Sequence, residues 1–294
     1  MSNSSLSPWD DSLVTALTAA IAAARARLER PVLTGISGVQ GSGKSTLCAQ
    51  LEMALAEAGL RAATLSLDDL YLTRAERRAR AAGVHPLFAT RGVPGTHDVG
   101  LGEAVIGGLL QGDGPVAIPR FDKAVDDRAP ERDWPVVAAP VDVLLFEGWC
   151  IAATPEPESA LAAPINALEA EEDRDGGWRR AVNAALAGDY QRLFARIDML
   201  ILLRAPDFSA VRAWRQQQED ALRAERGAAA GMDTATLGRF IAHYERLSRH
   251  MLASSPPPGA IIVDLDAGRQ VRAVIGLPAG RPGNQGGGTW PPPR

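Results

Sequence analysis

The fold of this chain is decided by one stretch of sequence, Thr34-Gly-Ile-Ser-Gly-Val-Gln-Gly-Ser-Gly-Lys-Ser-Thr46. Its part from Gly38 to Ser45 matches G-x-x-x-x-G-K-[ST], the pattern of the phosphate-binding P-loop. Glycines let a backbone adopt conformations closed to other residues and approach an anion without a side chain in the way. Successive amide N–H groups, together with the positive end of the following helix, then form a cradle for phosphates.

The residue types of this loop indicate how a nucleotide would be held. Lys44 would reach the β- and γ-phosphates and take part in catalysis, and the Ser45 hydroxyl would ligate Mg²⁺. The expected nucleotide-binding residues are Gly38, Gly41, Ser42, Gly43, Lys44, Ser45 and Thr46.

The alternative interpretation is a glycine-rich turn between a strand and a helix that binds nothing. The flanking sequence argues against it. Val32 to Ile36 is typical of a short buried strand, and after the loop apolar residues recur at helical spacing until Gly59, at Leu47, Leu51, Leu55 and Ala58. Strand, loop and helix therefore fall where a P-loop requires them.

Composition bounds the class of protein. The chain has 294 residues, 46% of them hydrophobic and 22% charged, which suffices for a sizeable core. A net charge of −4 gives no global positive field that would favour nucleic acid or an anionic membrane. Cys48 and Cys150 lie far apart, which fits a reducing compartment. With no apolar run long enough to span a membrane and no N-terminal signal, we expect a cytoplasmic enzyme. The sequence does not indicate its oligomeric state.

Strands and helices alternate along the chain. Apolar runs that predict further strands lie at Ala62–Leu67, Val141–Gly148, Met199–Leu203 and Ala260–Val263, and helical patterns lie at 12–28, 101–111, 183–194, 207–226 and 234–253. This alternation predicts an α/β fold of the P-loop NTPase type, with a parallel sheet covered by helices on both faces. Ligands of such sheets bind at the carboxyl ends of the strands.

Other segments carry narrower expectations. We expect a solvated basic helix at Arg74–Arg80, an ordered loop at 83–100 and an exposed turn at Glu169–Asp175. Residues 1–275 are expected to form a single domain, and 276–294, rich in glycine and proline, a disordered tail.

Acidic residues end two of the predicted strands. Glu147 can hold Mg²⁺ directly or through water, although a carboxylate there could instead cap a helix. Asp68 could accept a proton from a substrate hydroxyl, although many aspartates at strand ends are only helix caps. Asp69 is its neighbour, and on an extended strand end the two side chains point in opposite directions.

At this point the residues resemble a family. Leu65-Ser-Leu-Asp-Asp-Leu-Tyr71 and Phe146-Glu-Gly-Trp149 are similar to acidic motifs of the uridine kinase and phosphoribulokinase group. Narrower resemblances to plant-type D-glycerate 3-kinase and its microbial relatives lie at His85–Asp98, Ile118–Lys123, Asp127-Arg128, Trp134-Pro135 and Phe146–Cys150. The resemblance runs from about Pro31 to about Asp266.

The resemblance implies a P-loop kinase with a five-stranded parallel core that uses ATP and Mg²⁺ and phosphorylates a small hydroxy acid. It places the general base on Asp68 and the Mg²⁺-linked acid on Glu147. A glycerate carboxylate needs a cation in a water-poor pocket. The acceptor site is therefore expected in segments 83–135, with Asp69, Tyr71, Arg91, His97, Arg120, Asp122, Lys123 and Arg128.

The helix expected from Asp207 is part of a lid-like region, 207–230. One of its faces carries Arg212, Arg215, Glu219, Arg223 and Arg226. Such a mixed-charge face can simply be solvated. In related kinases, however, arginines of a mobile helix neutralise the transferring phosphoryl group, and the resemblance puts Arg212 and Arg215 in that catalytic position. The open alternatives are a uridine, pantothenate or sugar-phosphate kinase, or a nucleotide-dependent regulatory protein.

Overall fold

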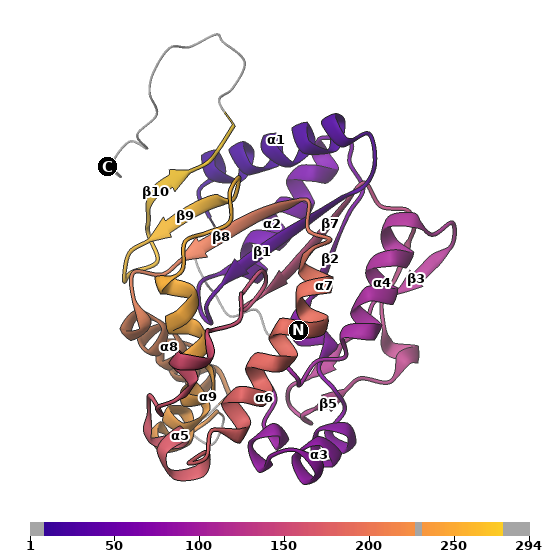
Figure 1. The fold of residues 1–294 in the computed structure, drawn as a ribbon. Helices are drawn as coiled ribbons and strands as arrows, with labels where there is room; N and C mark the ends of the chain where they lie inside the picture. The colour runs from indigo at the N-terminus through magenta and orange to yellow at the C-terminus, as the bar shows by residue number, and fades with distance from the viewer. Residues whose placement is uncertain (1–8, 227–230, 279–294) are drawn as a thin grey trace.

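A six-stranded sheet forms the centre of the molecule, in a computed structural model that describes residues 9–226 and 231–278 (Figure 1). Its strand order is β10-β9-β8-β1-β7-β2. The bounds are β1 Val32–Gly38, β2 Ala62–Ser66, β7 Val143–Gly148, β8 Met199–Arg204, β9 Ile261–Leu265 and β10 Val271–Ile275. Strands β2, β7, β1, β8 and β9 pair in parallel, as expected for the five-stranded core. All their carboxyl ends therefore lie at one edge.

The sixth strand, β10, was not predicted from the sequence. It pairs antiparallel with β9, so Ala260–Val263 does not mark the last strand of the chain. Its residues are exposed or half-buried at the edge of the sheet. A half-buried edge strand needs no continuous apolar run, and such a run was the signal used to find the other strands.

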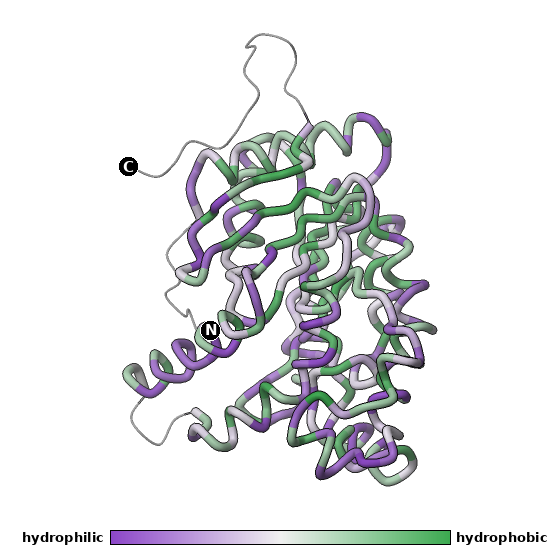
Figure 2. Tube along the Cα trace, turned by 60° about the vertical axis from the view of Figure 1, so that its left-hand side comes forward, coloured by the Kyte–Doolittle hydropathy of each residue, from purple (hydrophilic) through white to green (hydrophobic). Residues whose placement is uncertain are grey.

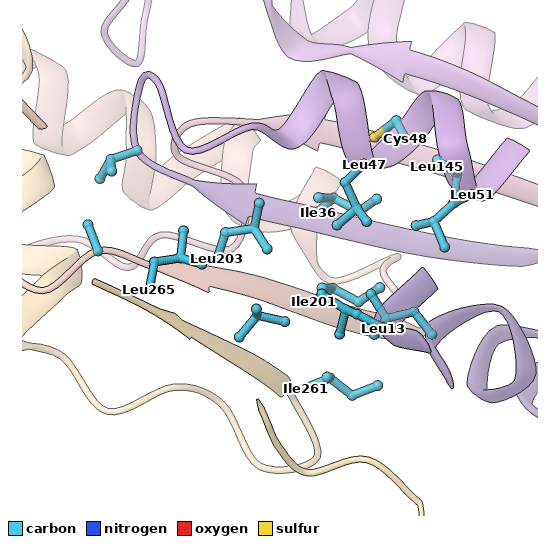
Figure 3. Packing of buried hydrophobic residues seen from close by; sticks show 14 of the residues in the cluster. Leu13, Ile36, Leu47, Cys48, Leu51, Leu145, Ile201, Leu203, Ile261 and Leu265 are labelled. Carbon is cyan, nitrogen blue, oxygen red and sulfur yellow. The ribbon is translucent and has the colours of Figure 1, made fainter. Parts of the chain in front are cut away.

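One face of the sheet is covered by α1, Asp11–Leu28, and α2, Lys44–Glu57, with α8, Phe208–Arg226, at its margin. Figure 3 shows Leu13 of α1 beside Ile201 of β8, and Leu47 and Leu51 of α2 over Ile36 and Leu145. The apolar stripe of the expected N-terminal helix is thus the buried face of α1.

The other face is covered by α4, Val99–Gln111, α7, Gln191–Phe194, and α9, Thr234–Ala253. Between these layers β1 and β7 are buried along their whole length, and green, hydrophobic stretches run through the strands in Figure 2. A sheet buried on both faces needs apolar side chains in both directions, which explains the continuous runs of the sequence.

Short elements lie around α4. They are a 3₁₀ turn at Leu67–Leu70, α3 at Arg74–Gly83, a second 3₁₀ turn at Pro86–Ala89, and the small ribbons β3 Pro115–Ala117 with β6 Val136–Ala138 and β4 Phe121–Asp122 with β5 Asp127–Arg128. A third 3₁₀ turn spans Glu131–Asp133. The basic helix α3 is only partly solvated, because Arg77 is fully buried and its guanidinium bonds Asp126 at 2.6 Å.

The exposed turn predicted at Glu169–Asp175 is wrong. A 3₁₀ turn at Glu158–Leu161 is followed by α5, Ala167–Glu172, and α6, Gly177–Ala185, which continues through a π-turn, Leu186–Tyr190, into α7. Glu169 and Asp173 are fully buried. Arg246 of α9 donates to both carboxylate oxygens of Glu169, at 2.8 and 2.7 Å. Arg179 pairs with Asp173 at 2.9 Å. Acidic composition predicted exposure, but paired charges can be buried.

Two predicted segments lie partly outside the described residues. Of the lid-like region 207–230, the structure describes α8 but not 227–230, and of the tail 276–294 it describes only 276–278. Within the described ranges, no helix is long and apolar enough to cross a membrane.

Candidate active site

The loop between β1 and α2 has the backbone geometry that its glycines predict. Gly41 has φ +79° and Gly43 φ +91°, both in the region that favours glycine. A Cβ on Gly41 would also lie only 2.7 Å from the Cβ of Trp214. Gly38 and Ser42 are buried, and Thr46 lies in the first turn of α2. The amide groups at the start of α2 can thus face an anion directly.

The ammonium group of Lys44 lies over this loop, and its Nζ donates to the Val39 carbonyl at 3.2 Å. Burial lowers the pKa of Lys44, and the nearby carboxylates of Glu147 and Asp68 oppose that effect. The cation is therefore held in a desolvated position between the loop and two acids. A phosphate there would meet a charge that little water screens.

Glu147 lies on β7, beside the loop. It accepts hydrogen bonds from the hydroxyls of Ser45 and Ser66, each at 3.0 Å and each to Oε1. Ser66 ends β2 and pairs with Glu147 across the sheet. This oxygen-only set fits Mg²⁺, which usually keeps water and phosphate oxygens among its ligands. No group of three or more histidine, cysteine or acidic side chains among the described residues could form an all-protein cage.

Asp68 and Asp69 lie in the 3₁₀ turn after β2, not on an extended strand end. The prediction that they point in opposite directions assumed an extended strand end, and that assumption is wrong. Both side chains line the same cavity, but they contact different partners.

Asp68 is held by two donors. Lys123 donates to its Oδ2 at 2.7 Å, and the Tyr71 hydroxyl to its Oδ1 at 2.9 Å. Burial alone would raise the pKa of Asp68, but attraction by Lys123 and both hydrogen bonds lower it below its ordinary value. The pKa of Lys123 is raised in turn, chiefly by the charge of Asp68. Asp68 is therefore ionised at neutral pH.

Asp69 has the opposite electrostatics. It accepts from the Phe121 amide at 3.0 Å, and Arg120 lies 3.3 Å away. Burial nevertheless dominates and raises its pKa from 3.8 to about 6. The adjacent charge of Asp68 adds to this increase. Asp69 therefore titrates near neutrality.

One cavity of about 490 Å³ joins these groups at the carboxyl edge of the sheet. Of the predicted residues it brings together Gly41, Lys44, Ser45, Asp68, Asp69, Tyr71, Arg91, Arg120, Lys123, Glu147 and Arg215. They come from the loop after β1, from α2, from the turn after β2, from the loop before α4, from the ribbon around β4, and from β7 and α8. The convergence predicted from strand ends is thus present in the described structure.

Four of the residues predicted for catalysis or acceptor binding do not line this cavity, and neither do the predicted nucleotide-binding residues Gly38, Ser42, Gly43 and Thr46. His97 lies behind Tyr71, with ring centroids 4.5 Å apart, and its Nδ1 lies 2.6 Å from the Tyr190 hydroxyl. Burial lowers the pKa of His97 to about 3, so it is neutral. Arg128 donates to the Tyr71 carbonyl at 3.0 Å. Asp122 is exposed and accepts from the Ala124 amide.

Arg212 is the fourth. It is exposed on α8, whereas Arg215, nearly one turn further along, lines the cavity and pairs with Glu219. Of the two arginines predicted to be catalytic, α8 therefore turns Arg215 toward the cavity and Arg212 toward solvent.

Aromatic residues complete the wall and were missed as a group. Trp149, Phe240 and Tyr244 line the cavity, the last two from α9. The Trp149 indole donates to the Gly92 carbonyl at 2.9 Å, and Tyr244 to the Arg91 carbonyl at 3.1 Å. A Cβ on Gly92 would overlap the Tyr244 hydroxyl. Trp149 belongs to the acidic strand motif, but no sequence signal marks Tyr244, because its partner loop is far away in the chain.

Comparison with known proteins gives consistent matches, although no protein-family model matches the chain. The uncharacterized kinase mug58 of Schizosaccharomyces pombe is 37% identical over 223 residues, which cover 73% of this chain and 79% of that protein. The chloroplastic D-glycerate 3-kinase of Arabidopsis thaliana is 31% identical over 257 residues, which cover 81% of this chain but 53% of the plant protein.

A solved structure shows the same similarity in three dimensions. The D-glycerate 3-kinase from Cryptococcus neoformans var. grubii matches with a TM-score of 0.75 and 26% identity, over 89% of this chain and 98% of that one. The similarity therefore extends over most of the fold.

Proposed function

Because this chain belongs to the D-glycerate 3-kinase-like family of P-loop kinases, we propose that it transfers the γ-phosphoryl group of ATP to a hydroxyl of D-glycerate. The main support for this acceptor is the set of side chains that line one cavity. A P-loop lysine, an ionised aspartate and three arginines line it together. We also propose that residues 1–275 act as a single kinase domain, since the P-loop and the segments around 83–135 all contribute to this site.

The nucleotide end of the cavity is proposed to hold the triphosphate. The loop from Gly38 to Thr46 would bind phosphate oxygens through backbone N–H groups. Lys44 would neutralise charge on the β- and γ-phosphates, where burial has already removed much of its water. Ser45 and Glu147 would hold Mg²⁺. When bound, Mg²⁺ would supply positive charge that offsets the negative charge developing in the transfer.

At the other end, Asp68 is proposed to orient the attacking hydroxyl and accept its proton. Its lowered pKa makes it a weak base, so orientation is the larger part of the role. That division suits phosphoryl transfer, in which positioning and electrostatics supply most of the catalysis. Lys123 and Tyr71 fix the carboxylate from two sides, which limits the directions from which a hydroxyl can approach.

The acceptor carboxylate is proposed to bind Arg120 and Arg91. An arginine matches a carboxylate with two parallel hydrogen bonds, and both guanidinium groups lie on the cavity wall. Each now pairs with a protein acid, Arg120 with Asp69 and Arg91 with Asp126. An incoming carboxylate would thus compete with, or join, pairs that are already in place. Trp149 and Tyr244 exclude water on the side of Gly92, where they pack against the backbone.

Arg215 is proposed to neutralise the transferring phosphoryl group from α8. It is the arginine of the predicted lid face that lines the cavity. Its ion pair with Glu219 would have to loosen or share when the phosphoryl group arrives. Arg212 could reach the site only if α8 moved.

One assay tests the acceptor directly. ADP release by the full chain is measured with Mg-ATP and each of glycerate, uridine, pantothenate and ribulose 5-phosphate. We expect turnover with glycerate to exceed that with every other compound. Faster turnover with one of the others would replace the acceptor. ATP binding without turnover of any would favour a nucleotide-dependent regulatory protein.

A further inference from the structure

A tryptophan ahead of α1 packs on the P-loop from outside the cavity. The indole N–H of Trp9 donates to the Gly43 carbonyl at 3.1 Å, and a Cβ on Gly43 would lie 3.0 Å from the indole ring. Gln50 of α2 fastens the backbone of Trp9 in both directions, accepting from its N–H at 2.8 Å and donating to its carbonyl at 3.1 Å. Trp9 is therefore positioned against the loop by three hydrogen bonds, and it remains partly accessible to solvent.

An arginine flanks the same loop from the hairpin between β9 and β10. Arg269 has φ +65°, and Asp266 holds the turn by accepting from the amides of Gly268 and Gln270. The Arg269 guanidinium lies 5.8 Å from the Trp214 ring and 3.5 Å from the Gly41 carbonyl, and it donates to Gln217. A positive φ is uncommon for a residue other than glycine, so the turn holds this side chain against a backbone preference.

The charge of Arg269 has no acidic partner among the described residues. Burial alone lowers its pKa, and no carboxylate opposes that effect. A half-buried, planar cation beside a phosphate-binding loop is thus available to a ligand. Trp9 and Arg269 approach the loop at Gly43 and Gly41, two residues apart, and neither lines the cavity that holds Asp68.

In the proposed function the cavity holds the phosphates and the acceptor, which leaves the outer side of the P-loop for the base and ribose of the nucleotide. Nucleobases stack on aromatic rings and on guanidinium planes. We propose that Trp9 and Arg269 bind the base of the donor nucleotide by stacking, as two walls on the outer side of the P-loop. This inference rests on the proposed function only in requiring a nucleotide donor; it does not depend on the acceptor.

The test separates the base from the phosphates. Isothermal titration without acceptor measures Kd for Mg-ATP and for inorganic tripolyphosphate, which has no base, on the full chain. Trp9→Leu removes the ring, and Arg269→Lys keeps the charge but removes the planar group. We expect each variant to weaken ATP binding about tenfold or more, the effect of losing one stacking partner, with little change for tripolyphosphate.

Two controls guard the interpretation. Trp9→Phe keeps a ring but loses the N–H donor to Gly43, and it should bind ATP more tightly than Trp9→Leu does. Arg192→Ala removes an exposed arginine that pairs with Asp189, and it should leave both affinities unchanged. Thermal unfolding checks that each variant is folded. If Trp9→Leu does not fold, the affinities of Trp9→Phe and Arg269→Lys test the stacking instead.

The outcomes are distinct. Equal losses for ATP and tripolyphosphate would overturn stacking and leave Trp9 and Arg269 as supports of the loop. Unchanged ATP affinity would overturn any contact with the base. A wild type that fails to phosphorylate glycerate, yet shows the selective loss in the variants, would refute the proposed acceptor and leave this inference standing.

Discussion

Asp68 and Asp69 are neighbours in the chain, yet they should respond to pH in opposite ways. Burial raises the pKa of Asp69 from 3.8 to about 6, because one backbone N–H and Arg120 do not offset the loss of water. For Asp68, Lys123 and Tyr71 outweigh burial and lower the pKa. Replacing each aspartate by asparagine removes the titration while nearly preserving shape.

The sign for Asp69 follows from proton linkage. The folded chain binds the Asp69 proton more tightly than the unfolded chain, so this proton stabilises the fold fully below about pH 4. That contribution is lost as the pH rises through about 6. The difference is about two pKa units at 1.36 kcal/mol each, which gives roughly 3 kcal/mol. The side chain is 20% exposed, so little solvent screening reduces this value. The free energy of unfolding of Asp69→Asn, relative to that of wild type, should therefore increase by up to about 3 kcal/mol as the pH rises from 4 to 7.

The sign for Asp68 is reversed. Its lowered pKa stabilises the fold above the ordinary range of a carboxyl group, and the contribution disappears as the pH falls through the lowered pKa. Asp68→Asn should therefore be less stable than wild type at pH 7 and approach it in acid. Its partner Lys123 is 60% exposed, so solvent screening keeps the effect modest.

Urea denaturation of the ligand-free full chain between pH 4.5 and 7.5 measures the Asp69→Asn difference, whereas Asp68→Asn should show a constant loss over this range, because its contribution disappears only below the ordinary pKa of 3.8. Equal m-values would license the comparison of free energies of unfolding. Asp113→Asn, at an exposed position, is the matched control and should give a small, pH-independent difference. A difference for Asp69→Asn that stays flat, or that falls as the pH rises, would refute the assignment of a raised pKa. Parallel slopes for Asp68→Asn and Asp69→Asn would refute the contrast between them.

Three kinetic predictions complete the set. Lys44→Ala should abolish phosphoryl transfer with an unchanged circular dichroism spectrum, and near-wild-type turnover would contradict the P-loop role. Asp68→Asn should lower kcat about 10²–10⁴-fold with little change in the KM for ATP, because a positioned base is lost. Asp69→Asn should act mainly on the acceptor KM, and a larger loss of kcat there would make Asp69 the base. Arg120→Ala should raise the KM for glycerate more than that for ATP, because it removes a hydrogen bond to a charged group that is worth roughly 1.5–3 kcal/mol. Glycerol, which has no carboxylate, should be a poor substrate of the wild type. Arg132→Ala, an exposed arginine, is the control, and equal use of glycerol and glycerate would rule out a carboxylate pocket.

The sequence alone determined the parts of this protein that depend on local pattern. The P-loop is a contiguous motif, and its glycines, lysine and serine have roles that follow from their order in the chain. Strands buried on both faces need continuous apolar runs, so β1, β2, β7, β8 and β9 could be predicted. Because parallel strands end at one edge, Lys44, Asp68 and Glu147 could be expected in one crevice before any coordinates were known.

The tertiary structure decided what depends on partners distant in the chain. Asp68 and Asp69 have opposite electrostatics because the ribbon around β4 brings Lys123 to one and Phe121 to the other. Glu169 of α5 and Asp173 just after it are buried because Arg246 of α9 and Arg179 of α6 reach them. His97 supports Tyr71 from behind, although both lie in segments that resemble the acceptor site.

Trp9 illustrates the same limit. It precedes the family resemblance and belongs to no motif, so only its hydrogen bond to Gly43 reveals a possible role. Arg269 likewise follows the last strand that the sequence predicted, and the turn that directs it depends on a strand, β10, whose edge position needs no apolar run. Local patterns specify which elements form, but charge, burial and contact are properties of pairs, and a pair exists only once the chain is folded.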